Sequence, residues 1–97
     1  MASKLISVNF EIYGKVQGVF FRKFTQEQAT ALGLRGWCMN STEGTVKGTI
    51  QGERKNIDEM KNWLQYKGSP YSKIEKAVFS EEKEIDEFSF NNFFVKR

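Results

Sequence analysis

The sequence has no histidine and only one cysteine among its 97 residues. Without imidazole, the Ser-His-Asp triad, histidine acid–base chemistry, phosphohistidine intermediates and most zinc sites are excluded. The lone Cys38 cannot form an internal disulfide, so the fold must be stabilised by packing, and a reducing compartment is expected. Whatever chemistry the chain performs must come from other side chains.

Long apolar runs are also missing. No stretch approaches the ~20 apolar residues that cross a bilayer, and the N-terminus MASKLISVNF lacks the apolar region of a signal peptide. These absences predict a cytoplasmic protein with no membrane partner. The length predicts one domain, residues 1–97, around a single core. We also expect a monomer, because no exposed apolar run is evident.

The charge balance is mildly basic. Fifteen Lys and Arg residues against twelve Asp and Glu give a net charge of +3, which suits an anionic partner without identifying one.

Hydrophobic periodicity predicts alternating strands and helices in the first half of the chain. Residues 6–12 alternate between apolar and polar side chains with the two-residue period of a half-buried strand. Residues 21–32 carry an apolar helical arc, and Gly33 follows as a C-cap. Residues 35–40 and 45–51 predict a hairpin, with a tight turn at residues 41–44.

The second half predicts one more helix and the rest of the sheet. Asn56 followed by Glu59 resembles a capping box that starts the helix, which ends near Gly68. Residues 73–84 and 88–95 are rich in strand-forming residues, and a parity shift at residues 91–92 indicates a bulge or an irregular end.

The order of these elements is βαββαβ. It predicts a ferredoxin-like α+β sandwich, in which two helices cover one face of an antiparallel sheet that has a short fifth strand. In this topology the strands at residues 6–12 and 35–40 run parallel, with residues 45–51 between them. Their C-terminal ends, ~10 Å apart, and the start of the first helix share one edge of the sheet. Arg22 and Asn40 are therefore expected to meet there.

The stretch GKVQGVFFRKF, from Gly14 to Phe24, lies where the first strand leads into the first helix. A loop that feeds a helix N-terminus presents unpaired backbone N–H groups and the positive end of the helix dipole. Gly14 and Gly18 allow the positive φ angles that let these groups converge on one phosphate. Arg22 can then bind two phosphate oxygens with its planar fork, and Lys15 can raise the local potential.

Two further segments complete a resemblance to a known family. GKVQGVFFRKF, GLRGWCMNSTEGTVKGTIQG and GSPYSKIE resemble the acylphosphatase family, specifically its common-type branch, in order from about Val8 to Val95. The resemblance implies a small monomeric enzyme that hydrolyses the carboxyl-phosphate bond of acyl phosphates. No cofactor or metal is expected, because a carboxylate is already a good leaving group. Ser41 keeps a hydroxyl where the family commonly has Thr, so a hydrogen bond that fixes Asn40 can be retained.

The resemblance also implies the site residues. Inorganic phosphate is expected as product and competitive inhibitor. Arg22 and Asn40 are the implied catalytic residues, and the implied phosphate-binding residues are Lys15, Val16, Gln17, Gly18, Val19, Phe20 and Phe21.

The two catalytic residues suggest a mechanism. A carboxamide such as that of Asn40 can orient a water molecule but cannot take its proton. The hypothesis is that the substrate's own phosphate accepts the proton, and that the carboxylate leaves without an acid or a metal.

Other functions fit the sequence less well. A cysteine phosphatase needs Arg six positions after its Cys, where Cys38 is followed by Gly44, and no Walker nucleotide loop is present. An RNA-recognition module shares the βαββαβ order, but residues 44–52 contain no aromatic residue that could stack on a base. Tyr13 is a single aromatic ring and is weak evidence for RNA binding by itself. No nucleic acid is therefore expected as partner. A non-catalytic domain that binds acyl phosphates is the other alternative, and the presence of Arg22 and Asn40 argues against it.

Overall fold

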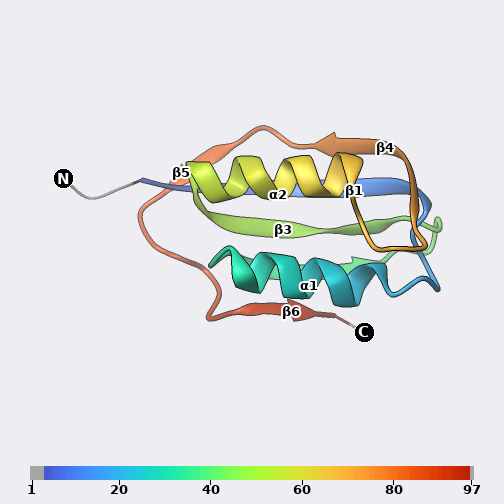
Figure 1. Ribbon diagram of the computed structural model, residues 1–97. Helices are drawn as coiled ribbons and strands as arrows, with labels where there is room; N and C mark the ends of the chain where they lie inside the picture. The colour runs from blue at the N-terminus through green and yellow to red at the C-terminus, as the bar shows by residue number, and fades with distance from the viewer. Residues whose placement is uncertain (1–3, 97) are drawn as a thin grey trace.

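A six-stranded sheet with two helices on one of its faces makes up the protein (Figure 1). The coordinates are a computed structural model and describe residues 4–96. The elements follow one another as β1 (Leu5–Lys15), α1 (Phe21–Ala31), β2 (Arg35–Asn40), β3 (Val46–Glu53), α2 (Arg54–Tyr66), β4 (Lys73–Phe79), β5 (Lys83–Ile85) and β6 (Phe93–Val95). The expected βαββαβ order is confirmed.

The path of the sheet is β4-β1-β3-β2-β6, with β5 paired to the start of β1. Both β1 and β2 are antiparallel to β3, so they run parallel to each other with β3 between them, as the sequence predicts. Strand β6 pairs with β2 in parallel. The sheet is therefore mixed, and the prediction of a wholly antiparallel sheet is wrong at this edge.

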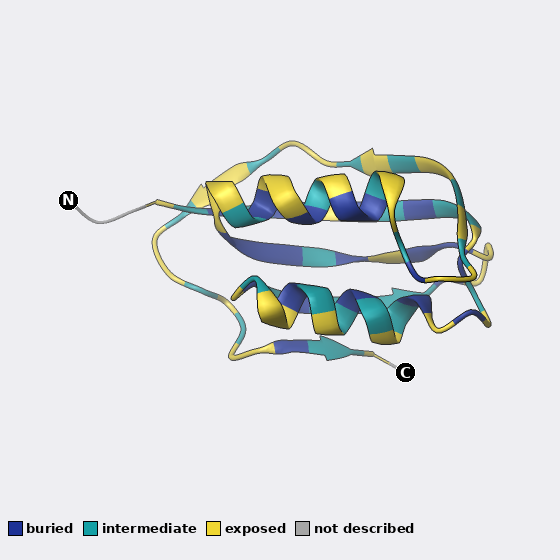
Figure 2. Cartoon of the chain, in the orientation of Figure 1, coloured by how far each residue is buried: buried dark blue, intermediate teal, exposed yellow. Residues whose placement is uncertain are grey.

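The core lies between the helices and the sheet (Figure 2). Alternate residues of β1 face the helices and are almost fully buried, as the two-residue period predicts. Both helices turn one buried side toward the sheet and one exposed side away from it. The buried residues are Ile6, Val8, Phe10 and Ile12 on β1, Phe21, Thr25 and Ala29 on α1, and Ile57, Met60, Trp63 and Leu64 on α2.

The start of α2 differs from the prediction. The helix begins at Arg54, with Glu53 as its N-cap and no side-chain cap, so Asn56 lies inside the first turn and forms no capping box with Glu59. Strand β3 passes directly into α2. A cap is worth about 1 kcal/mol, whereas burying Ile57 completely against the sheet is worth about 2 kcal/mol. Packing therefore decides where this helix begins.

The C-terminal strands are shorter than predicted. Residues 73–84 are interrupted between β4 and β5, and only Phe93–Val95 of residues 88–95 pair as a strand. Residues 86–92 instead carry the chain from β5, beside β1, to the opposite edge of the sheet (Figure 1). Gln51 holds this crossing segment, because its side chain accepts the Ser89 N–H at 2.8 Å and donates to the Ser89 hydroxyl at 3.3 Å.

Of the bulge or irregular end predicted at residues 91–92, the structure shows an irregular end, because those residues are bends that lead directly into β6. A register shift occurs between Tyr13 and Gly14, where β1 pairs with β4. Gly14 has φ 123°, and a Cβ there would lie 2.1 Å from the Lys73 carbonyl oxygen. Only glycine permits this close approach, which ends β1 beside the connection to α1.

Neither helix within residues 4–96 is long and apolar enough to span a bilayer.

Candidate active site

The connection between β1 and α1 twice adopts the left-handed conformation. Gly18 has φ 74°, as expected, and Phe20 has φ 59° and ψ 22°. Phe20 is the N-cap of α1, and no side chain caps this helix. The first N–H groups of α1 therefore have no intrahelical partner, and the positive end of the helix dipole lies at the connection. Such an end attracts an anion.

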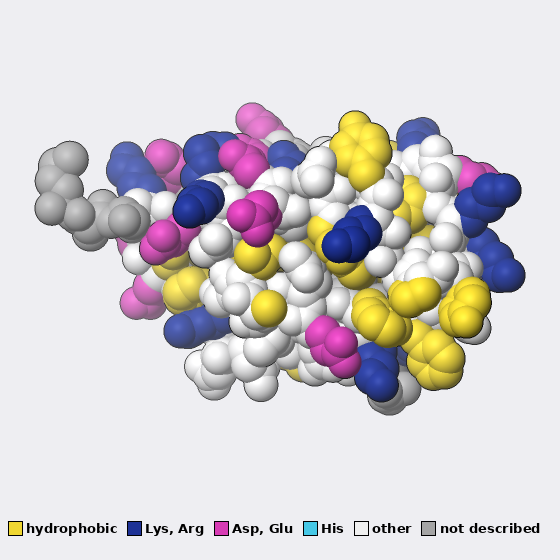
Figure 3. Space-filling view, viewed as in Figure 1, with side chains coloured by type: hydrophobic (Ala, Val, Ile, Leu, Met, Phe, Trp, Pro, Cys, Tyr) yellow, Lys and Arg dark blue, Asp and Glu magenta, His cyan; other side chains and the backbone are white. Residues whose placement is uncertain are grey.

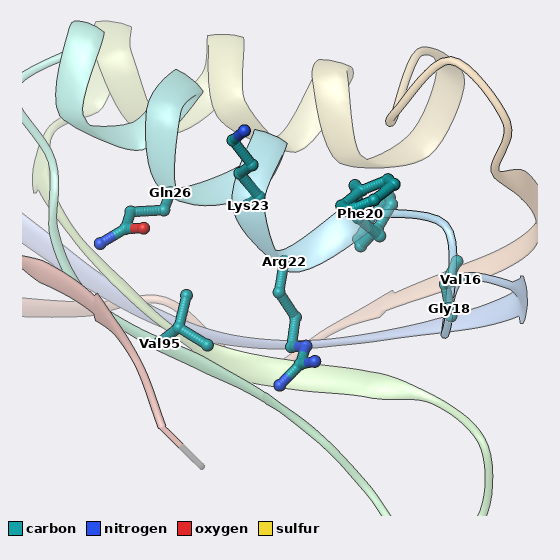
Figure 4. Close-up of a pocket in the computed structure, with 8 residues that line it drawn as sticks. Val16, Gly18, Phe20, Arg22, Lys23, Gln26 and Val95 are labelled. Carbon is teal, nitrogen blue, oxygen red and sulfur yellow. The ribbon is translucent and has the colours of Figure 1, made fainter.

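A depression of about 430 Å³ opens beside this helix end (Figure 4). In Figure 4 the Arg22 side chain extends from α1 toward the sheet, with Val95 of β6 on one side and Phe20 on the other. The two charged residues that line the depression, Arg22 and Lys23, are both cationic. The depression is lined by Val16, Gly18, Phe20, Phe21, Arg22, Lys23, Gln26 and Val95.

Three of the residues expected to bind phosphate do not line the depression. Lys15 is the exposed last residue of β1 and precedes the loop. The Gln17 side chain donates to the backbone oxygens of Ser41, at 3.0 Å, and Thr45, at 2.9 Å. The buried Val19 contributes its carbonyl oxygen, which accepts a hydrogen bond from the Ser69 hydroxyl at 3.0 Å. Gln17 and Val19 therefore hold the shape of the loop.

Asn40 is the last residue of β2 and does not line the depression either. The chain nevertheless brings β2 against α1, since the Cys38 thiol points at the Arg22 carbonyl oxygen at 3.9 Å. The Asn40 Oδ1 atom is buried and has no hydrogen-bond partner within residues 4–96. Because buried polar atoms are nearly always paired, this oxygen is a candidate acceptor for a bound molecule.

The turn after Asn40 is fixed by side chains. The hydroxyls of Ser41 and Thr45 lie 2.5 Å apart, and Thr45 in turn donates to a Glu11 carboxylate oxygen at 2.7 Å. The Ser41 oxygen also accepts the Thr45 N–H at 3.0 Å. The hydroxyl expected at position 41 therefore stabilises the turn, and no hydrogen bond joins it to the Asn40 side chain.

Cys38 lies next to the site but cannot act as a nucleophile. It is fully buried, and this burial raises the pKa of its thiol to about 12, although the Arg22 charge lowers it. The thiol therefore stays protonated near neutral pH, and a thiolate mechanism is excluded.

Comparisons with known proteins agree with this arrangement. The acylphosphatase family profile matches residues 8–95. Acylphosphatase-1 of Drosophila melanogaster is 52% identical over 90 residues, which are 93% of this chain and 75% of the relative. Acylphosphatase-1 of Homo sapiens is 51% identical over 89 residues, which are 92% of this chain and 90% of the relative. The chain belongs to the acylphosphatase family.

Solved acylphosphatases share the fold. An acylphosphatase structure from Coxiella burnetii matches with a TM-score of 0.84 and 31% identity, covering 96% of this chain and 94% of that one. Membership confirms the resemblance carried by the three sequence segments. It also confirms the expected activity, since members of the acylphosphatase family hydrolyse acyl phosphates.

Sequence reasoning missed three residues that line the acylphosphatase depression: Lys23, Gln26 and Val95. Gln26 follows Arg22 by four positions, so helical spacing alone could have placed both on one side of α1. Its side chain donates to the Phe93 carbonyl oxygen at 3.3 Å and so links α1 to β6. No local sequence pattern predicts a place for Val95 in the site, because the parallel pairing of β6 with β2 puts it there.

Proposed function

We propose that this acylphosphatase binds the phosphoryl group of its substrate with Arg22 and the loop amides, while Asn40 orients the attacking water. The observation that carries the proposal is the cationic depression at the uncapped N-terminus of α1. An acyl phosphate is anionic at its phosphoryl end, and both backbone N–H groups and a guanidinium favour phosphate oxygens.

Arg22 has the larger electrostatic role. Its planar fork can donate to two phosphoryl oxygens at once and stays charged at any working pH. As the bond between phosphorus and the carboxylate oxygen breaks, charge builds on the groups that Arg22 and the loop amides contact. The loop amides are already held in place, since Gln17 and Ser69 bind the loop through hydrogen bonds.

Asn40 supplies orientation rather than a proton acceptor. Its unpaired Oδ1 can accept a hydrogen bond from a water molecule, but a carboxamide cannot take the water's proton. The water oxygen attacks phosphorus, the carboxylate leaves with the bonding electrons, and the proton passes to a phosphate oxygen. Because a carboxylate is a good leaving group, the proposed reaction uses no cofactor, metal or general acid.

The product binds where the substrate did, so inorganic phosphate should compete with acyl phosphates. We further propose that the chain works in the cytoplasm as a monomer, with small acyl phosphates rather than nucleic acid as partners. The single buried Cys38 supports a reducing compartment, because no disulfide is available to require an oxidising one.

The test is the hydrolysis of benzoyl phosphate in the presence of a chelator. We expect the parent to be active and both Arg22→Gln and Asn40→Ala to lower kcat/KM by about 100-fold or more. Only Arg22→Gln should also weaken inhibition by inorganic phosphate. Lys83→Gln is the matched control, since it removes one positive charge from β5 and lies outside the depression.

Each other outcome contradicts a specific part of the proposal. Loss of activity with chelator would show a metal requirement. An Asn40→Ala variant with parent activity would place the water-orienting group elsewhere. An inactive but folded parent would mean that the chain binds acyl phosphates without hydrolysing them.

A further inference from the structure

Phe20 is not explained by packing or by backbone preference. Its side chain is 68% exposed, so the ring adds little to the core. Its φ of 59° lies in the left-handed region, where asparagine and glycine are accommodated more easily than a bulky aromatic residue. A strained and exposed aromatic residue beside an anion site points to a role in ligand binding.

Phe20 lines the depression together with Val95. These two apolar side chains stand on opposite sides of Arg22, one from the loop and one from β6 (Figure 4). Figure 3 shows apolar side chains gathered at the same end of the molecule. The depression therefore has a cationic centre and two apolar walls.

The two ends of a bound acyl phosphate would contact different parts of the depression. With the phosphoryl group at Arg22 and the loop amides, the acyl group must lie against the remaining lining. Gln26 is already engaged with the Phe93 carbonyl, which leaves the walls at Phe20 and Val95 as the free apolar surface. The volume of about 430 Å³ falls in the range of roughly 300–1,000 Å³ typical of sites for small organic ligands.

We propose that Phe20 and Val95 form an acyl-group subsite that favours acyl phosphates with an aromatic or bulky apolar acyl group over those with a small one. This inference rests on the proposed function. The physical basis is removal of apolar surface from water and, for an aromatic acyl group, contact with the Phe20 ring. Phe20 is thus a specificity-determining residue.

The experiment compares benzoyl phosphate with acetyl phosphate. The two acyl phosphates differ in intrinsic reactivity, but every variant is assayed with the same two substrates. The change in the ratio of their kcat/KM values between variants therefore reports the acyl contact alone. In Phe20→Asn, which suits the left-handed backbone but lacks the ring, we expect the benzoyl-to-acetyl ratio to fall by about three- to tenfold. Phe20→Tyr keeps the ring and should retain the parent ratio.

Tyr66→Ala is the matched control. Tyr66 is 77% exposed, also aromatic, and does not line the depression, so its removal should leave the ratio unchanged. Inhibition by inorganic phosphate should change little in Phe20→Asn, because phosphate has no acyl group. Thermal unfolding of Phe20→Asn should occur no lower than in the parent, which separates a lost contact from misfolding.

An unchanged ratio in folded Phe20→Asn would overturn the subsite while leaving the proposed function intact. An equal fall of the ratio in Tyr66→Ala would also overturn it, since the effect would then not depend on the depression. A folded parent that hydrolyses neither acyl phosphate would overturn the proposed function and the subsite with it.

Discussion

Gln17 acts on the active site without facing it. Its side-chain amide joins the β1–α1 loop to the β2–β3 turn through two hydrogen bonds, to the backbone oxygens of Ser41 and Thr45. The loop that is proposed to bind phosphate and the turn that follows Asn40 are thereby held together. Gln17 is a positioning residue, because it acts through these two segments.

Replacing Gln17 by leucine should therefore lower both stability and turnover. We expect Gln17→Leu to reduce the free energy of unfolding by about 1–3 kcal/mol, because two partly buried carbonyls each lose one of their donors. In benzoyl phosphate hydrolysis kcat should fall, and Gln17→Asn, which is one methylene shorter, should not restore it. The matched control is Gln65→Leu on α2. Its free energy of unfolding, measured in urea, should lie within about 0.5 kcal/mol of the parent value. Equal effects of the two leucine variants would contradict the positioning role.

Cys38 offers a second test at the scale of one residue. Because the thiol is fully buried and its pKa is raised to about 12, iodoacetamide at pH 8 should not label the native protein. In denaturant the same reagent should add one carbamidomethyl group, detected by mass spectrometry. Stoichiometric labelling of the native protein would show that the site opens in solution.

At the scale of elements, sequence patterns predicted those that depend on local periodicity. Strand β1, helix α1 and the β2–β3 hairpin follow directly from the spacing of buried residues. The start of α2 was missed because a favourable cap at Asn56 competes with burial of Ile57, and burial is the larger effect. The predicted strand at residues 88–95 is longer than β6, because phenylalanine is common in strands. Phe88 instead lies in the crossing segment, where its ring centroid is 3.9 Å from the Arg35 guanidinium.

The same distinction applies to the candidate site. Arg22 and the loop are contiguous in sequence, so helix-end electrostatics and glycine placement identified them. Val95 lies more than seventy residues away along the chain and reaches the depression only because β6 pairs with β2. Its contribution depends on a long-range parallel pairing that no local pattern encodes.

Glu82 joins α2 to the segment between β4 and β5. Its carboxylate accepts hydrogen bonds from Lys61 at 2.8 Å and Arg54 at 3.0 Å. The bond from Lys61, and next the bond from Arg54, lower the pKa of Glu82 below the usual 4.5. A lowered pKa in the folded state adds stability above the unfolded pKa, and this stability is lost as the pH falls through the folded value.

We therefore expect Glu82→Gln to lower the free energy of unfolding by about 1 kcal/mol at pH 7, after allowing for solvent screening. The difference from the parent should shrink as the pH falls below the usual carboxyl pKa and vanish below the lowered pKa of folded Glu82, as urea unfolding at several pH values would show. Glu84→Gln is the control, because Glu84 is exposed and its contact with Lys4 is 3.6 Å long. A difference between Glu82→Gln and the parent that does not depend on pH would contradict the assignment.

At the scale of the whole molecule, the fold is compact but elongated. Its Cα radius of gyration is 12.6 Å, close to the value of about 12.5 Å expected for a single chain of this length, and its extents are 42 × 23 × 22 Å. Small-angle scattering should give a radius only slightly larger, because of hydration. A much larger radius, with doubled forward scattering at equal concentration, would contradict the proposed monomer.

The parallel pairing of β6 has a practical consequence for protein engineering. Leu5, where β1 begins, and the β1–α1 loop, which follows the end of β1, lie at opposite ends of that strand (Figure 1). Val95, by contrast, lines the depression itself. A fluorescent reporter or affinity handle joined ahead of β1 would stand a strand's length from the depression. The same fusion joined beyond β6 would lie at the opening of the depression and obstruct substrate entry.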